Sequence, residues 1–257
     1  MDYKNITVHE VGFTSEIIIN RPGHMNALDG NTRAELLLAL KSFNENDNQR
    51  VAVLSGSGTS FSSGADLSGT PENIDEDYIY RELTESFHKI AKEIRLSSKI
   101  FISSIDGIVA GAGMSLAFLC DLAYASPSSR FIMGFQEIGL APDTGLSLIL
   151  SRLGGARLLP YLLKGGEFNA EFARNAGLVE VCEKPYLHAL EEAHKIASGP
   201  YMAYCTSKEF ITRSLFPDFD EFLNYEAKKQ PALGMSHDFR EGIESFHEKR
   251  KPHFNGR

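Results

Sequence analysis

Residues 100–143 read IFISSIDGIVAGAGMSLAFLCDLAYASPSSRFIMGFQEIGLAPD, and the rest of the chain can be interpreted outward from this stretch. Ile100–Ile105 has the length and the apolar residues of a buried strand. A glycine-rich turn, Gly107–Gly113, follows and leads into an apolar helical segment, Met114–Cys120. A helix that begins directly after small residues presents unpaired backbone N–H groups at the positive end of its dipole. The stretch therefore predicts a place for an anion, or for an oxygen that becomes anionic during a reaction.

Three other interpretations of the glycine-rich turn have to be weighed. Gly111-Ala112-Gly113 resembles the start of a dinucleotide fingerprint, but Leu116 stands where that motif needs its third Gly or Ala. A phosphate loop of the GxxxxGK[ST] kind does not occur in the chain. Small residues are also ordinary where a helix packs tightly on a strand. This stretch alone therefore leaves function and packing as alternatives.

Composition narrows the class of protein. A chain of 257 residues is long enough for one large domain, or for a domain with an appendage. Its formal charge of -8 argues against nucleic acid or an anionic membrane surface as a partner. Three cysteines without CxxC spacing are typical of free thiols in a reducing compartment. With no apolar run long enough to cross a bilayer and no leader at its start, the chain is expected to be a cytoplasmic protein.

The order of apolar patterns predicts an α/β core followed by a helical C-terminal region. Beyond Lys184-Pro185 the strand signals stop, and only helical spacings follow. Thr70–Asp77 is acidic, begins next to Pro71 and is predicted to be a mobile loop. The other predicted elements are paired strands at 6–8 and 17–19, a helix capped by Asp29 or Asn31, a strand at 51–54, a loop at 56–64, a long helix at 78–96, a strand at 122–125, short helices at 146–153, 157–163 and 170–176, a strand at 178–181, and helices at 186–197, 200–215, 219–232 and 237–249.

Two segments share one chemical property. Ser63-Gly64-Ala65-Asp66 follows one predicted strand, and Gly111-Ala112-Gly113 follows another. Each can offer one backbone N–H to the same oxygen. Such a pair of donors stabilises an enolate or a tetrahedral oxyanion, and losing one donor costs roughly a hundred- to thousandfold in rate.

With these motifs in order, the sequence resembles the enoyl-CoA hydratase/isomerase family, the crotonase superfamily, over nearly its whole length. Each motif is weak alone, and their order makes the resemblance strong. The motifs are Asn20-Arg21-Pro22, Met25-Asn26-Ala27-Leu28, Phe61-Ser62-Ser63-Gly64-Ala65-Asp66-Leu67, Ile105-Asp106-Gly107, Gly111-Ala112-Gly113, Cys120-Asp121, Leu140-Ala141-Pro142-Asp143, Glu241-Gly242-Ile243 and residues 246–250.

The resemblance implies an architecture and a substrate. The fold would be a crotonase-like spiral of ββα units over residues 1–197, with a C-terminal helical region at 198–257 that trimerises. The assembly would be a homotrimer or a hexamer built as a dimer of trimers. The substrate would be an acyl-CoA thioester of fatty-acid metabolism. Coenzyme A would enter as part of that substrate, with no tightly bound cofactor, and nothing in the sequence requires a metal, a nicotinamide or a flavin.

The resemblance also implies site residues by matching position. The oxyanion-hole N–H groups would be those of Ala65 and Ala112, where the family usually has Gly at the second place. The segments that hold the coenzyme's nucleotide and pantetheine would be Met25, Asn26 and Ala27 together with Ser63, Gly64, Asp66 and Leu67, with Gly111 beside them. Phe246 and Lys249 match a C-terminal part that reaches the coenzyme.

The general acid/base is where this chain departs from the family's hydratases. Those enzymes carry two glutamates, and the matching positions here hold Ser115 and Phe135. Asp143 remains, at the place where the isomerase branch has its single acid/base residue. That branch includes the Δ3,Δ2-enoyl-CoA isomerases and the 1,2-epoxyphenylacetyl-CoA isomerase type. Phe135 is a candidate for an apolar wall that would raise the aspartate's pKa.

Several alternatives stay open. Asp143 precedes Thr144-Gly145, so it also fits a turn or helix-cap residue. Glu137 is the second candidate for the base. The leading hypothesis is an isomerase that shifts a double bond from Δ3 to Δ2. The alternatives are an enoyl-CoA hydratase of fatty-acid or aromatic-acid degradation, a non-catalytic acyl-CoA-binding protein and, less favoured, a hydrolase.

Overall fold

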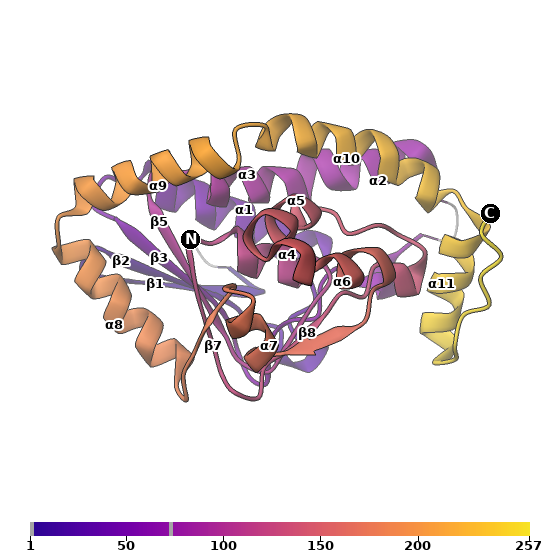
Figure 1. The fold of residues 1–257 in the computed structure, drawn as a ribbon, viewed down its shortest axis with the longest axis horizontal. Coiled ribbons are helices and arrows are strands. Elements are labelled where there is room, and N and C mark those ends of the chain that lie inside the picture. The colour runs from indigo at the N-terminus through magenta and orange to yellow at the C-terminus, as the bar shows by residue number, and fades with distance from the viewer. Residues whose placement is uncertain (1–2, 72–73) are drawn as a thin grey trace.

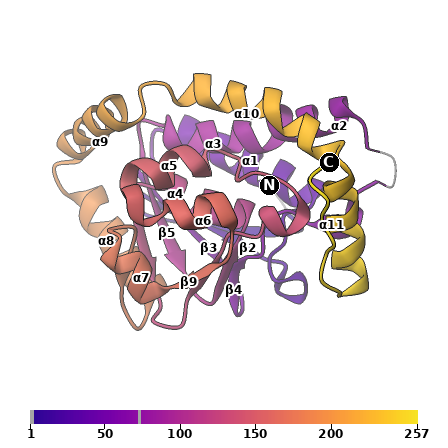
Figure 2. The same ribbon diagram turned by 45° about the vertical axis from the view of Figure 1, so that its right-hand side comes forward.

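The computed structural model describes residues 3–71 and 74–257 (Figures 1 and 2). Its main sheet has six strands in the order β1-β2-β3-β5-β7-β10. Only the β1–β2 hairpin is antiparallel, and the other neighbours run parallel. Parallel strands need cover on both faces, which explains why every residue of β5 is buried. The strands are β1 (Ile6–Val11), β2 (Thr14–Ile19), β3 (Val51–Gly56), β5 (Ile100–Ile105), β7 (Leu122–Ala125) and β10 (Glu180–Val181).

A second, four-stranded sheet has the order β4-β6-β8-β9. The sequence pattern did not predict it: β4 lies inside the predicted loop at 56–64, and β6 lies inside the predicted glycine-rich turn. Strands of three residues are too short for an alternating pattern to be recognised. These strands are β4 (Ser60–Ser62), β6 (Ile108–Ala110), β8 (Arg130–Ile132) and β9 (Glu167–Asn169).

The two sheets are linked in a repeating way. Along the chain, β3 leads to β4, β5 to β6 and β7 to β8, so that each pair puts one strand in each sheet. Gly107 makes one of these turns with a φ of +70°, and a β-carbon there would lie 1.9 Å from the Thr59 carbonyl oxygen. The close approach of β4 and β6 therefore requires glycine. The expected spiral of ββα units is confirmed.

Helices cover both faces of the main sheet. Asp29 caps the first of them, accepting from the Thr32 N–H. The predicted helix at 78–96 is confirmed as one continuous helical stretch, but it begins at Glu76 and contains a π-helical segment. The predicted mobile loop therefore overlaps the start of this helix, and its residues 72–73 lie outside the described part of the chain. The elements are α1 (Gly30–Glu45), α2 (Glu76–Arg81), the π segment η3 (Glu82–Phe87) and α3 (His88–Arg95).

The central stretch continues through a wholly buried helix, α4. All eight of its residues are buried, as the apolar run predicts. The remaining short elements are α4 (Ala112–Leu119), α5 (Leu146–Leu153), α6 (Leu159–Lys164) and α7 (Ala170–Asn175), with 3-10 turns η1 (Pro22–His24), η2 (Leu67–Gly69), η4 (Gln136–Ile138) and η5 (Gly155–Arg157).

The last four helices pack on the core of the same chain. In Figure 1 the orange-to-yellow α9 and α10 run along α3 and α2, and α11 follows at the end that carries the C-terminus. α11 lies close to η4 because Gly242 has no side chain: a β-carbon there would be 2.5 Å from the Ile138 Cα. No helix among the described residues is long and apolar enough to cross a membrane. These helices are α8 (Pro185–Ser198), α9 (Tyr201–Leu215), α10 (Phe219–Gly234) and α11 (His237–Glu248).

Candidate active site

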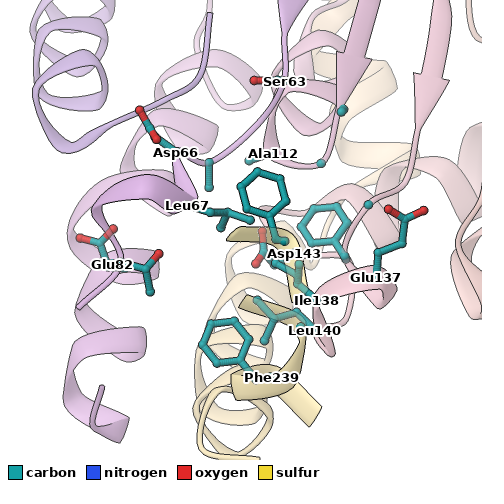
Figure 3. A pocket seen from close by; sticks show the side chains of 18 of the residues that line it. Ser63, Asp66, Leu67, Glu82, Ala112, Glu137, Ile138, Leu140, Asp143 and Phe239 are labelled. Carbon is teal, nitrogen blue, oxygen red and sulfur yellow. The ribbon is translucent and has the colours of Figure 1, made fainter. Parts of the chain in front are cut away.

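A cavity of about 860 Å³ lies between the second sheet, α2 with η3, η4 and the C-terminal helices. Its wall combines segments from across the chain, and most of the wall is apolar (Figure 3). The predicted site residues that line it are Ser63, Ala65, Asp66, Leu67, Gly111, Ala112, Phe135, Glu137, Asp143, Phe246 and Lys249. Four other predicted residues, Met25, Asn26, Ala27 and Gly64, do not line it.

The two predicted N–H donors lie at neighbouring points of this wall. Ala112 is the first residue of α4, and Ala65 follows β4. A β-carbon built on Gly64 would lie 3.2 Å from the Ala112 nitrogen and 2.8 Å from the Ala110 oxygen, so the two segments touch. Within the described residues, neither the Ala65 nor the Ala112 N–H donates a hydrogen bond to the protein. Both are available to one ligand oxygen.

Residues 25–28 support the first donor segment from behind. The Ser63 N–H donates to the Met25 oxygen at 2.9 Å, and the Leu28 N–H donates to the Gly64 oxygen at 2.8 Å. Asn26 is fully buried, and its amide donates to the Ser57 and Ser60 oxygens at 2.8 and 2.7 Å. The Asn26 side chain therefore fixes the chain path, while contact of this segment with a coenzyme stays a prediction.

Asp66 fixes the same loop, while its predicted contact with a coenzyme stays a prediction. Its carboxylate pairs with Arg21 at 3.0 Å and accepts from the Ser68 N–H at 3.2 Å. Two further lining residues come from the C-terminal part: Phe246 of α11 is exposed, and Lys249 follows α11 in a left-handed conformation. The cavity mouth therefore combines an exposed aromatic ring with a positive charge.

Asp143 is nearly buried, with 9% of its surface exposed. One carboxylate oxygen accepts from the Thr144 hydroxyl at 2.8 Å, and the other accepts from the Gln230 amide at 3.0 Å. The helix that follows, α5, has Gly145 as its N-cap and no side-chain cap. Asp143 is therefore not a helix-cap residue, and its carboxylate belongs to the cavity wall between Ala112 and Leu140 (Figure 3).

The surroundings of Asp143 make it a stronger base than an exposed aspartate. Burial, and then the nearby Glu226 carboxyl, raise the pKa of Asp143 to about 6, against opposing effects of Thr144, His88 and Gln230. A carboxyl group with a pKa in this range is ionised at neutral pH and can still hold a proton during a reaction. The electrostatics therefore suit an acid/base role.

Three residues behind Asp143 were not predicted from sequence. Glu226 accepts from the Gly145 N–H at 3.0 Å, and its carboxylate lies 3.4 Å from the His88 Nε2. Burial raises the pKa of Glu226 to about 8 and lowers that of His88 to about 4. One sequence pattern could have pointed to two of them. Glu226 and Gln230 are polar residues one helical turn apart, on the helix face that also carries the apolar Leu223.

The other acid/base candidates have different surroundings. Glu137 lines the cavity from η4, and Figure 3 shows its carboxylate directed away from Asp143. Phe135 is buried in the wall, as an apolar neighbour should be. Ser115 is buried, and its hydroxyl donates to the Asp143 carbonyl oxygen at 3.1 Å, so it supports the turn. No group of three metal-ligating side chains occurs within the described ranges.

Comparison with known proteins places this geometry in a family. The family model described as "Enoyl-CoA hydratase/isomerase" matches residues 14–257. A trans-2-decenoyl-[acyl-carrier-protein] isomerase of Streptococcus mutans is 30% identical over the whole of both chains. A probable enoyl-CoA hydratase of Rhodobacter capsulatus is 34% identical, also over the whole of both. A 1,2-epoxyphenylacetyl-CoA isomerase of Escherichia coli is 30% identical over 94% of each chain.

The fold agrees as well. The crystal structure of an enoyl-CoA hydratase from Mycobacterium avium subsp. paratuberculosis superposes with a TM-score of 0.87 at 25% identity, covering 99% of this chain and all of that one. A solved structure named as an enoyl-CoA hydratase thus shares this architecture. The resemblance inferred from the ordered motifs is confirmed, and the chain belongs to the enoyl-CoA hydratase/isomerase family of the crotonase superfamily.

Proposed function

We propose that this protein is an enoyl-thioester isomerase that moves a double bond from Δ3 to Δ2 with one carboxylate base, Asp143. The observation that carries the proposal is the pairing of one buried carboxylate with two free N–H groups in one cavity wall. The places where hydratases of the family carry glutamates hold Ser115 and Phe135. Two relatives named as isomerases support the same choice.

The reaction follows from what these groups can do. Asp143 takes a proton from C2 of a 3-enoyl thioester, and the electron pair of that C–H bond moves towards the thioester carbonyl. The Ala65 and Ala112 N–H groups stabilise the resulting dienolate oxygen. Protonated Asp143 then returns the proton to C4, which leaves the double bond between C2 and C3. A single base suffices because the proton leaves from and returns to one face of the substrate.

The cavity suits an apolar acyl group carried on a phosphate-bearing arm. Family enzymes act on CoA thioesters, and one relative's name specifies an acyl carrier protein. Lys249 and Lys251 at the mouth supply positive charge for phosphate. We therefore infer a CoA thioester substrate. Its acyl group would pack on Leu67, Ile79, Leu83, Phe87, Ile138, Leu140 and Phe239.

The test is proton exchange at C2 and isomerisation of a 3-enoyl-CoA in deuterated water, comparing the wild type with Asp143→Asn. We expect the wild type to turn over and the variant to lose at least about a hundredfold in kcat, because removing a positioned acid/base typically costs 10²–10⁴-fold. KM should change little, since the amide keeps the volume of the carboxylate.

The control is Glu137→Gln, which is expected to keep the wild-type rate. An unchanged rate in Asp143→Asn would remove the aspartate from the mechanism. Tight binding of the thioester without turnover by the wild type would instead favour a non-catalytic acyl-CoA-binding role.

Hydration is the second candidate function. Glu137 lines the cavity, and the Rhodobacter relative is named as a probable hydratase. Hydration of crotonyl-CoA by the wild type, lost in Glu137→Gln and kept in Asp143→Asn, would establish this function in place of isomerisation.

A further inference from the structure

Two buried polar side chains on α10 are the only groups of that helix that bond to the turn carrying Asp143, within the described residues. Gln230 and Glu226 are 3% and 8% exposed, one helical turn apart. Burying an amide or a carboxyl costs free energy unless its hydrogen bonds are made. Apolar residues occupy the same helix face at Leu223 and Ala227, so packing alone would not require polar residues here.

We propose that Gln230 and Glu226 are positioning residues of the reaction: Gln230 orients the Asp143 carboxylate, and Glu226 holds the turn behind it. This inference rests on the proposed function, because it assigns these residues to the same base. α10 then positions the base in addition to packing on the core.

Gln230 ties the carboxylate to its own loop. The Nε2 atom donates to the Asp143 Oδ2 at 3.0 Å and to the Ala141 carbonyl oxygen at 2.8 Å. Both hydrogens of the amide are thereby used. Because Thr144 donates to the other carboxylate oxygen, the plane of the carboxylate is fixed from two sides. A base held in this way needs no reorientation before it reacts.

Glu226 holds a turn of unfavourable backbone conformation. Thr144 has a φ of +57° and Gly145 a φ of +79°. Such a conformation costs of order 1–3 kcal/mol at a residue other than glycine and persists only where the surroundings enforce it. The Glu226 carboxyl accepts from the Gly145 N–H with both oxygens, at 3.0 and 3.2 Å. On the far side of this carboxyl, the His88 Nε2 of α3 lies 3.4 Å away.

The groups that face Asp143 come from three elements and its own loop. α10 provides Glu226 and Gln230, α3 provides His88, and the loop provides Thr144, while Ser115 of α4 bonds to the backbone carbonyl only. The Gln230 bond favours the charged carboxylate. Its loss must therefore raise the pKa of Asp143, which a loosened helix would not do selectively.

The first experiment replaces Gln230 with Met, which has similar volume and no donor. We expect kcat for the 3-enoyl-CoA to fall about tenfold or more, since a hydrogen bond to a charged group is lost. KM should hold, and the acid limb of kcat/KM should move to higher pH. The matched control is Gln49→Met, a buried amide that donates to the Gly12 oxygen at 3.1 Å between β1 and β2. The control should leave the pH profile unchanged.

The second experiment compares two changes at Glu226. Glu226→Gln keeps an acceptor for the Gly145 N–H and should keep most of kcat. Glu226→Ala leaves that buried N–H unpaired. We expect a large fall in kcat together with only a small fall in the melting temperature. Equal kcat losses in the two variants would overturn the role of Glu226.

A measurement without substrate separates this inference from the proposed function. Carboxyl-carbon NMR of labelled aspartate can follow the titration of Asp143, assigned by its absence in Asp143→Asn. A titration shifted to higher pH in Gln230→Met, and unshifted in Gln49→Met, supports the inference. An unshifted titration in Gln230→Met overturns it, whatever the activity. An inactive wild type overturns only the proposed function.

Discussion

At the scale of one residue, burying the ionised carboxylate of Asp143 lowers the unfolding free energy of the protein at neutral pH. In the unfolded chain its carboxyl ionises near its ordinary pKa of 3.8, whereas burial raises the pKa to about 6 in the folded protein. The folded state therefore binds a proton more tightly than the unfolded state does. Stability contributed by this group is present below the unfolded pKa and is lost as pH rises through the folded one.

Asp143→Asn should consequently be more stable than the wild type at pH 7.5. The shift from 3.8 to about 6 corresponds to roughly 2–3 kcal/mol of unfolding free energy, an upper value because Glu226 shares the titration. The difference should shrink as pH falls towards 4, where both proteins carry a neutral side chain. Urea unfolding at several pH values measures it, and a difference independent of pH would mean that ionisation of Asp143 is not its cause.

Single residues were predictable from sequence where a motif fixes their surroundings. Three residues of the cavity wall were predicted in this way. Asp143 was recognised by its position after Pro142, and Ala65 and Ala112 by the small residues around them. Gln230 and Glu226 could not be predicted in this way. The apolar periodicity of their helix indicates which face is buried, but it does not indicate which polar residue on that face has a hydrogen-bond partner. The role of a buried polar side chain can be recognised only when the structure shows which distant residue it contacts.

At the scale of elements, one ion-pair network fastens α9 to the core. Lys208 is the one buried side chain of α9. Its amine pairs with Asp121 at 2.9 Å and donates to the Lys99 carbonyl oxygen at 2.7 Å. Arg95 pairs with the same aspartate from α3. The network joins the C-terminal region to the N-terminal end of β5.

Lys208→Met should therefore destabilise the protein without changing its chemistry. We expect a loss of about 2 kcal/mol, because Asp121 keeps Arg95 but the carbonyl oxygens of Lys99 and, at 3.3 Å, Ile94 lose a donor. The rate constant kcat should be unchanged, since Asp143 lies elsewhere. Lys195→Met is the control: it removes an exposed lysine that pairs with Glu192 on α8, and it should not alter the unfolding curve. Equal stability of both variants would show that the network contributes nothing.

Elements differed in how far they could be predicted from sequence. The long helices were predictable because their periodic patterns span many residues, and the strands of the main sheet because their apolar runs, of at least four residues, stand out between turns; of the run at 178–181, only Glu180–Val181 forms the strand β10. The second sheet was not, since β4 and β6 have three residues each and lie among glycines and serines. These strands are defined by their neighbours across the sheet, at positions such as Gly107 where only a residue without a side chain fits.

At the scale of the whole molecule, α9 carries large apolar side chains that stay exposed within the described part of the chain. Met202 is 84% exposed, Phe210 67% and Ile211 51%. Large exposed apolar residues gathered on one helix are typical of contacts between subunits. We therefore retain the prediction that residues 198–257 take part in forming a trimer or a hexamer.

Met202→Asp combined with Phe210→Asp should lower the molar mass in solution, because burying two carboxylates in an apolar contact is unfavourable. Light scattering coupled to gel filtration measures the mass. Leu38→Asp, at an exposed leucine of α1, is the control and should leave the mass unchanged. A monomeric wild type would remove this prediction.

The contact between Gln230 and Asp143 spans 87 residues of sequence. During synthesis the donor segments around Ala65 and Ala112 and the base itself leave the ribosome well before α10 is made. Until Gln230 and Glu226 arrive, the aspartate sits on an unsupported turn. A nascent or truncated chain that lacks α10 would thus carry every reacting group and still be a poor catalyst. Full activity would require synthesis to have passed residue 230.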